Sequence, residues 1–112
     1  MMQNKVEGLL GLTRRAGKLS LGHDAAEDAI VSGKAKLCIL AKDASERLKA
    51  EMARTIAFKQ NETKLIETAY TKAELSMCIG AKSVAVFTID DEGFAKAILK
   101  LTGKDGLDDE KI

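Results

Sequence analysis

Two nearly continuous apolar runs, separated by segments with helical spacing, constrain the fold of this chain most strongly. The first run covers residues 35–41 (AKLCILA) and the second covers residues 83–89 (SVAVFTI). Such runs are typical of strands that are covered on both faces. Shorter strand-like segments lie at residues 19–21 and 63–69, and helical patterns fill the intervals. This alternation predicts an α/β fold, a three-layer α/β/α sandwich with a four-stranded mixed sheet.

Helix boundaries in this sequence rest on acidic, threonine and glycine residues, because the chain contains no proline. Five helices are predicted: residues 3–16, Asp24 to about Gly33, a helix after Asp43, Thr71 to Gly80, and a helix after Asp91. Three of the starts resemble capping boxes, in which a glutamate follows the cap three residues later: Asp24 with Glu27, Asp43 with Glu46, and Thr71 with Glu74. The predicted core contains Ile30, Leu37, Ile39, Leu48, Val84, Val86 and Ile98.

Length and composition indicate one soluble globular domain over residues 1–102, followed by a polar C-terminal tail over residues 103–112. No apolar run approaches the roughly 20 residues that span a bilayer, and no signal peptide is recognisable. We therefore expect a cytoplasmic protein without membrane contact. In a reducing compartment Cys38 and Cys78 are expected to be small buried thiols, neither a disulfide nor a zinc site.

Positive charge is concentrated near the N-terminus, although the formal net charge of the chain is only +1. Arg14, Arg15 and Lys18 end the first predicted helix and precede Gly22, where the next helix begins. Free backbone N–H groups and the dipole attract anions to a helix N-terminus. Cations beside such a terminus suit a phosphate backbone. The alternative is that these cations form the ordinary solvated end of a helix.

The chain resembles the L7Ae ribosomal protein family over roughly residues 5–101. The core signature is matched by Gly22, Ala29-Ile30, Gly33, Ala35-Lys36-Leu37, Ile39-Leu40-Ala41 and Asp43-Ala44. Leu75 and Gly80 match a later segment ahead of a valine-rich strand. The pattern Gly-Leu-x-x-Arg-x-x-Lys at residues 11–18 and the segment Asp-Glu-Gly-Phe-Ala at residues 91–95 are similar to short bacterial members of the YlxQ type.

The resemblance implies a three-layer α/β/α fold and binding of structured RNA, which in the best-understood members is a kink-turn. Kink-turn binders carry Asn-Glu-x-x-Lys at the helix start that follows the glycine. This chain has Asp24, Ala25 and Asp28 at those three positions. A carboxylate can accept hydrogen bonds from a guanine amino group, but Asp in the lysine position repels phosphate. The resemblance therefore implies RNA binding with altered kink-turn specificity, and a ribosomal or translation-associated role.

The candidate RNA-binding residues combine the basic positions, the helix start and the loop that meets a flipped-out nucleotide in the family. They are Arg14, Arg15, Lys18, Gly22, His23, Asp24, Ala25, Asp28, Lys34, Lys36, Ala81, Lys82 and Ser83. The alternative function is a protein-interaction module of the translation machinery that has lost specific RNA binding, which the acidic helix start favours.

An enzyme is not expected, because the sequence contains no phosphate loop and no recognisable nucleophile–base set. His23 with its acidic neighbours is a poor metal site, and neither a metal nor another cofactor is expected. With one Tyr and three Phe residues, the chain is also a poor stacking platform for single strands.

Overall fold

A computed structural model describes residues 5–59 and 63–102 of the chain, as five helices and four strands in alternation. In chain order these are α1 (Lys5–Arg15), β1 (Leu19–Leu21), α2 (His23–Val31), β2 (Leu37–Leu40), α3 (Glu46–Lys59), β3 (Lys64–Glu67), α4 (Lys72–Ile79), β4 (Val86–Ile89) and α5 (Glu92–Thr102). The predicted elements are all present, and β1 has the predicted bounds, whereas β2, β3 and β4 are shorter than the segments that predicted them. The predicted tail lies outside the described residues.

The four strands form one mixed sheet in the order β1-β4-β2-β3. β4 is antiparallel to both of its neighbours, and β2 runs parallel to β3. Leu37 pairs with Ile89 and Leu40 pairs with Val86, so β2 and β4 occupy the centre in full register. The two central strands are buried along their whole length. This explains why their sequences are nearly continuous apolar runs.

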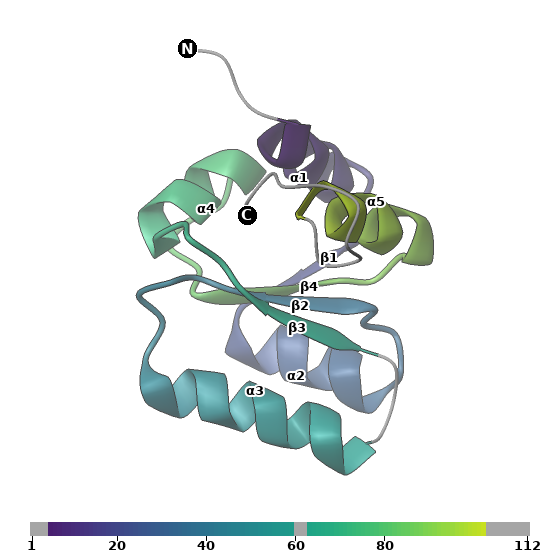
Figure 1. The fold of residues 1–112 in the computed structure, drawn as a ribbon, viewed down its shortest axis with the longest axis vertical. Coiled ribbons are helices and arrows are strands. Elements are labelled where there is room, and N and C mark those ends of the chain that lie inside the picture. Colours follow the sequence, from purple (N-terminus) through teal and green to yellow (C-terminus); the bar gives the residue numbers. More distant parts are fainter. Residues whose placement is uncertain (1–4, 60–62, 103–112) are drawn as a thin grey trace.

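Helices cover both faces of the sheet, as the sequence predicted (Figure 1). α2 and α3 lie together on one face, and α1, α4 and α5 lie on the other. The alternation along β2 separates the two cores: Leu37 and Ile39 pack toward α1, α4 and α5, while Cys38 and Leu40 pack toward α2 and α3. Of the predicted core, only Leu48 and Val84 are partly rather than fully buried.

The two cysteines lie on opposite sides of the sheet and are free. Cys38 is fully buried beneath α2 and α3, as predicted. Cys78 on α4 is only partly buried, so the expectation of a buried thiol is wrong for this residue. Burial raises the pKa of both thiols, to about 12 for Cys38. Both side chains are therefore neutral thiols at physiological pH.

The helix caps agree with the sequence at two of the predicted starts. Thr71 and Glu74 form a complete capping box on α4, which ends at Gly80 in the left-handed conformation. Asp91 accepts a hydrogen bond from the Phe94 N–H at the start of α5, at 2.9 Å.

α3 does not begin as predicted, because the cap is Ser45 and not Asp43. The Ser45 hydroxyl oxygen accepts from the Leu48 N–H at 3.1 Å. Asp43 is used elsewhere: its Oδ1 accepts from the Lys72 N–H at 2.8 Å, in the first turn of α4. Asp43 therefore connects the β2–α3 loop to α4.

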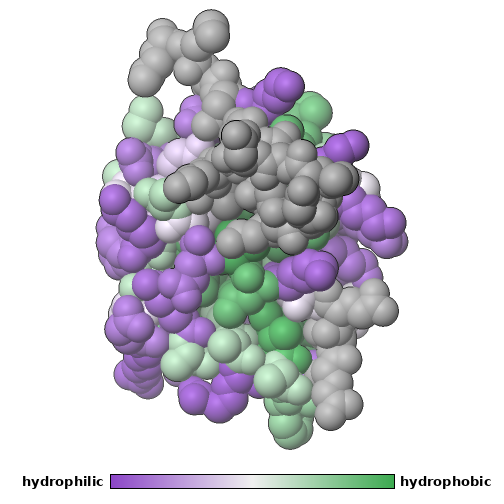
Figure 2. All heavy atoms as spheres, in the orientation of Figure 1, coloured by the Kyte–Doolittle hydropathy of each residue, from purple (hydrophilic) through white to green (hydrophobic). Residues whose placement is uncertain are grey.

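On the face shown in Figure 2, hydrophilic side chains lie mainly along the two sides, and hydrophobic ones extend from the middle toward the bottom of the view. Among the residues that the structure describes, the large apolar side chains that stand exposed are Leu12, Val31, Phe58 and Met77. Phe58, near the end of α3, is the most exposed of them, at 84%. Within the described residues, none of the helices has the length and apolar character needed to cross a bilayer.

Candidate functional site

The N-terminus of α2 lies at one end of the sheet, and its first turn has no side-chain cap. Gly22 joins β1 to α2 with a φ of 92°, and its N–H donates to the Val86 carbonyl at 3.0 Å. Its own carbonyl accepts the first helical bond, from the Ala26 N–H at 2.9 Å. The N–H groups of the first turn are therefore left without an intrahelical partner. Together with the helix dipole they favour a negatively charged ligand.

The predicted capping pair of Asp24 and Glu27 is wrong. The positive φ of Gly22 turns the chain directly into the helix, so His23 is already helical and Asp24 lies exposed in the first turn. Glu27 lies toward α3, where its Oε2 accepts from the Thr55 hydroxyl at 3.4 Å. The Asp24 carboxylate is thus a surface group beside the uncapped N–H groups.

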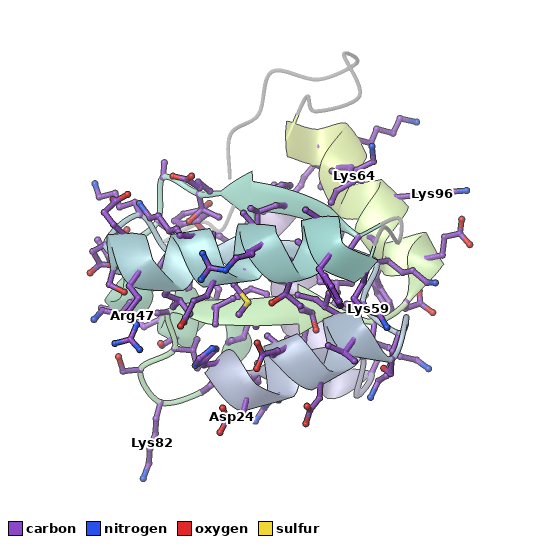
Figure 3. The ribbon with its side chains drawn as sticks, turned by 90° about the horizontal axis from the view of Figure 1, so that it is seen from below. Asp24, Arg47, Lys59, Lys64, Lys82 and Lys96 are labelled. Carbon is purple, nitrogen blue, oxygen red and sulfur yellow. The ribbon has the colours of Figure 1, made fainter. Side chains whose placement is uncertain are left out.

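The loop between α4 and β4 lies at the same end of the sheet as the start of α2. Its position is fixed at the base, where the Ser76 carbonyl accepts from the Ala81 N–H and the Ser76 hydroxyl accepts from the Val84 N–H, both at 3.0 Å. Between these anchors Lys82 and Ser83 are exposed and Ala81 is partly buried. Lys82 and Asp24 both project from this end of the molecule (Figure 3). The structure therefore brings the predicted loop and the predicted helix start together.

A shallow hollow between the starts of α2 and α3 belongs to the same end and was not predicted from the sequence. It is lined by His23, Ser45, Arg47, Leu48 and Glu51. Glu51 contacts two of these side chains: its Oε1 lies 3.5 Å from His23 Nε2 and its Oε2 lies 3.5 Å from Arg47 Nε. Twenty-eight positions separate His23 from Glu51, so no local spacing in the sequence could have indicated the contact.

The basic residues before β1 do not lie beside the start of α2, contrary to the expectation from sequence. The carbonyl of Lys18 accepts from the Asp90 N–H at 2.8 Å, which places Lys18 where β4 ends. Gly22 is bonded to Val86, where β4 begins. β1 rises about 3.3 Å per residue, so its length separates Lys18 from Gly22 by roughly 13 Å. Arg14 and Arg15, at the end of α1, precede Lys18 and are also exposed.

Lys34 and Lys36 follow α2 and lie with Lys18 at that far end of the sheet. Lys36 donates its N–H to the Ile89 carbonyl at 2.8 Å, and Lys34 Nζ lies 3.9 Å from Asp90 Oδ2. Asp28 is exposed on α2, one turn beyond Asp24. The other predicted site residues divide into two groups. Those at the start of α2 and in the α4–β4 loop are Gly22, His23, Asp24, Ala25, Ala81, Lys82 and Ser83. Those at the far end are Arg14, Arg15, Lys18, Lys34 and Lys36.

The two ends differ in charge. At the start of α2, Glu51 contacts both Arg47 and His23, and Lys82 on the neighbouring loop has no ion pair with another described residue. The far end carries a larger excess of lysine. Neither end holds three or more His, Cys, Asp or Glu side chains placed to bind a metal ion, as far as the described residues extend. The start of α2 and the loop beside it can therefore offer backbone N–H donors, the Lys82 ammonium group and carboxylate acceptors.

Comparison with known proteins gives the family of this chain. The family model described as the ribosomal protein L7Ae/L30e/S12e/Gadd45 family matches residues 4–99. RNA-binding protein YlxQ of Enterococcus faecium is 36% identical over 99 residues, which cover 88% of this chain and 92% of that protein. RNA-binding protein YlxQ of Bacillus subtilis (strain 168) is 31% identical over 93 residues, which cover 83% and 90%. Both relatives are named for RNA binding and not for an enzymatic activity.

Solved structures share the fold. A Bacillus halodurans protein of unknown function has a TM-score of 0.78 and 27% identity, covering 88% of this chain and 97% of its own. The Giardia lamblia 15.5kD RNA binding protein has a TM-score of 0.68 over 96% and 93% of the two chains. The two sequences are only 17% identical, so this likeness shows a shared fold and nothing further. The family model, the relatives and the α/β/α architecture agree, and this chain belongs to the ribosomal protein L7Ae/L30e/S12e/Gadd45 family.

Proposed function

We propose that this chain is a non-enzymatic RNA-binding protein whose primary RNA site is the start of α2 together with the α4–β4 loop. Family membership and the names of the relatives support RNA as the ligand. The observation that carries the placement is the uncapped N-terminus of α2, which lies at the same end of the sheet as the exposed Lys82. A backbone phosphate at this terminus would accept hydrogen bonds from the free N–H groups, while Lys82 would contribute a point charge.

The side chains on α2 favour a specificity different from that of kink-turn binders. Asp24 and Asp28 are exposed four residues apart, so both carboxylates stand on one face of the helix. Asp24 can accept a hydrogen bond from a base amino group, whereas Asp28 repels a phosphate placed near it. Ala25 offers no polar atom. We infer that a standard kink-turn binds weakly and that the natural ligand is another structured RNA, of the ribosome or the translation machinery, in the cytoplasm.

The sharpest test converts the α2 residues to the kink-turn pattern. The variant Asp24→Asn, Ala25→Glu, Asp28→Lys and the wild type are titrated against a kink-turn RNA and against the same RNA without its sheared G·A pairs. We expect the wild type to discriminate poorly between the two RNAs. Each restored base contact is worth about 1–3 kcal/mol of discrimination, so the variant should discriminate clearly. Tight and selective binding by the wild type would contradict the inference, because Asp24 would then recognise the guanine edges of the kink-turn.

The natural RNA can be found independently of that experiment. RNA crosslinked to the protein in cells is recovered and sequenced, with a Lys82→Ala variant as the matched control. Enrichment of defined structured RNAs that falls in the variant supports the proposed site.

A second candidate is a protein-interaction module of the translation machinery, and the two exposed carboxylates near the start of α2 favour it. Its signature would be recovery of a partner protein with no enrichment of RNA above the background of an unrelated protein.

A further inference from the structure

A row of lysines crosses the end of the sheet opposite to the start of α2. Lys18 precedes β1, Lys36 precedes β2, and Lys64 is the first residue of β3. In the strand order β1-β4-β2-β3 these lysines stand at three of the four strands, and Asp90 follows the fourth. Lys64 also lies far from Asp24 and Lys82, at the other end of the molecule (Figure 3). We call Lys18, Lys36 and Lys64 the lysine row.

Backbone hydrogen bonds fix the positions of the row. The Lys18 carbonyl accepts from the Asp90 N–H at 2.8 Å, and the Lys36 carbonyl accepts from the Lys64 N–H at 3.2 Å. Lys36 itself donates to the Ile89 carbonyl at 2.8 Å. Neighbouring strands lie about 4.8 Å apart, so Lys36 and Lys64 are one spacing apart and Lys18 and Lys36 are two. The row therefore extends over roughly 15 Å on a rigid base.

The row presents positive charge that the described part of the chain does not neutralise. All three side chains are exposed, and none has an ion pair with another described residue. Glu62 lies outside the described residues. Asp90, which follows β4 between Lys18 and Lys36, is turned inward with only 3% of its side chain exposed.

Internal partners occupy the Asp90 carboxylate. It accepts hydrogen bonds from the Ser20 and Thr88 hydroxyls, and Lys34 Nζ lies 3.9 Å away. The next acid, Asp91, caps α5. Lys59, at the end of α3, adds a further exposed cation at this end (Figure 3).

We propose that the lysine row is a second phosphate-binding surface, which contacts the backbone of an RNA segment other than the one at the start of α2. The proposal rests on the proposed function only in taking RNA as the ligand. Lysine ammonium groups act as point charges on flexible stems, so they neutralise phosphates without reading bases. A DNA double helix carries one negative charge per about 1.7 Å of axis, and at a similar charge density in duplex RNA a row of roughly 15 Å faces several phosphates. The recognised partner is duplex backbone, irrespective of sequence.

The test compares two triple variants with the same change of charge. Lys18→Ala, Lys36→Ala, Lys64→Ala removes the row. Lys5→Ala, Lys72→Ala, Lys100→Ala removes three lysines from α1, α4 and α5. The probe is a short mixed-sequence RNA duplex without G·A pairs, titrated over a series of salt concentrations. Circular dichroism establishes that each variant is folded, and single Lys36→Gln and Lys64→Gln variants provide the same readout with a smaller perturbation.

We expect the row variant to bind the duplex more weakly and with a smaller salt dependence than the control variant. Each lost phosphate contact lowers the slope of log K against log salt by about 0.9, or roughly 2.7 for three contacts. Each single variant should lower it by about one contact, and the control should keep the wild-type slope.

The outcomes separate this inference from the proposed function. If the row variant and the control match in affinity and slope while Lys82→Ala weakens RNA binding, the row is not a phosphate site and the primary site stands. If the row variant loses an acidic protein partner but no RNA affinity, the row is a protein contact and the inference fails. If the wild type binds neither this duplex nor any crosslinked cellular RNA, both proposals fail.

Discussion

Individual residues in the centre of the sheet are those that the sequence identifies most reliably. Ile39 is predicted as core from the apolar run around it, and it is fully buried in β2. Val84 and Leu48 carry the same apolar signal but lie at the edges of their packed layers, where neighbours cover them only in part. Periodicity gives the face on which a side chain lies. How fully that side chain is covered depends on elements distant in sequence.

Replacing Ile39 by Ala should lower the free energy of unfolding by about 2–5 kcal/mol, because it removes buried methyl groups and leaves a cavity. Phe58→Ala is the matched control, since its larger side chain is 84% exposed. We expect that control to change stability by less than about 0.5 kcal/mol. Urea unfolding followed by circular dichroism measures both. A small effect at Ile39, equal to that at Phe58, would contradict the burial of β2.

The buried Cys38 thiol should make stability fall at alkaline pH. Burial raises the pKa of this thiol from 9.0 to about 12, so above pH 9.0 the unfolded chain loses a proton that the folded chain keeps. The stability that the buried neutral thiol of Cys38 allows is fully present below pH 9.0, and it is lost as the pH rises toward 12. The loss approaches about 1.4 kcal/mol per pH unit in that window.

The measurement is urea unfolding at a series of alkaline pH values for the wild type, Cys38→Ala and Cys78→Ala. The wild type should lose stability with pH more steeply than Cys38→Ala. Cys78 is only partly buried, so Cys78→Ala should stay closer to the wild type. Parallel curves for the wild type and Cys38→Ala would contradict the raised pKa.

At the scale of elements, the order and type of helices and strands follow from the sequence, but two helix starts do not. Thr71 with Glu74 forms its predicted capping box because both partners belong to one helical turn. Asp43 carries a similar local signal, but the approach of α4 in space gives it another donor, the Lys72 N–H. At α2, the positive φ of Gly22 starts the helix at His23, so Asp24 lies inside the first turn and does not cap it. Local patterns therefore locate a helix to within a turn, whereas tertiary contacts choose the cap.

The two capping residues near α3 and α4 should stabilise different helices. Ser45→Ala should cost about 1 kcal/mol and increase hydrogen exchange in the first turn of α3. Asp43→Ala should instead increase exchange in the first turn of α4, because its carboxylate accepts from Lys72 and not from α3. Amide exchange measured residue by residue distinguishes the two helices. Faster exchange in α3 after the Asp43 change would restore the capping assignment made from sequence.

The whole molecule shows what the sequence could not predict about the candidate site. Arg14, Arg15 and Lys18 are close to Gly22 in sequence, which suggested a single basic site. β1 carries the chain across the sheet and separates them, while Lys64 joins Lys18 from a position more than forty residues away. Strand order depends on long-range pairing, and local patterns do not encode it. Membership of the family and the loop near α2 were predictable, whereas the division of charge between two ends was not.

If RNA contacts the two ends separately, the losses of binding free energy from substitutions at the two ends should add. Lys82 lies at the start of α2, and Lys36 lies at the far end of the sheet, separated from it by the length of β4. Sites that share no partner usually add within about 0.3–0.5 kcal/mol. On a long structured RNA that reaches both ends, Lys82→Ala with Lys36→Ala should therefore lose the sum of the two single losses in binding free energy. On a short duplex that one end can hold, the Lys82 change should matter less than the Lys36 change. Fluorescence titrations with both RNAs measure the wild type, the two single variants and the double variant. If the double variant bound the long RNA as tightly as a single variant does, the two lysines would contact the same phosphates and the two-site inference would be wrong.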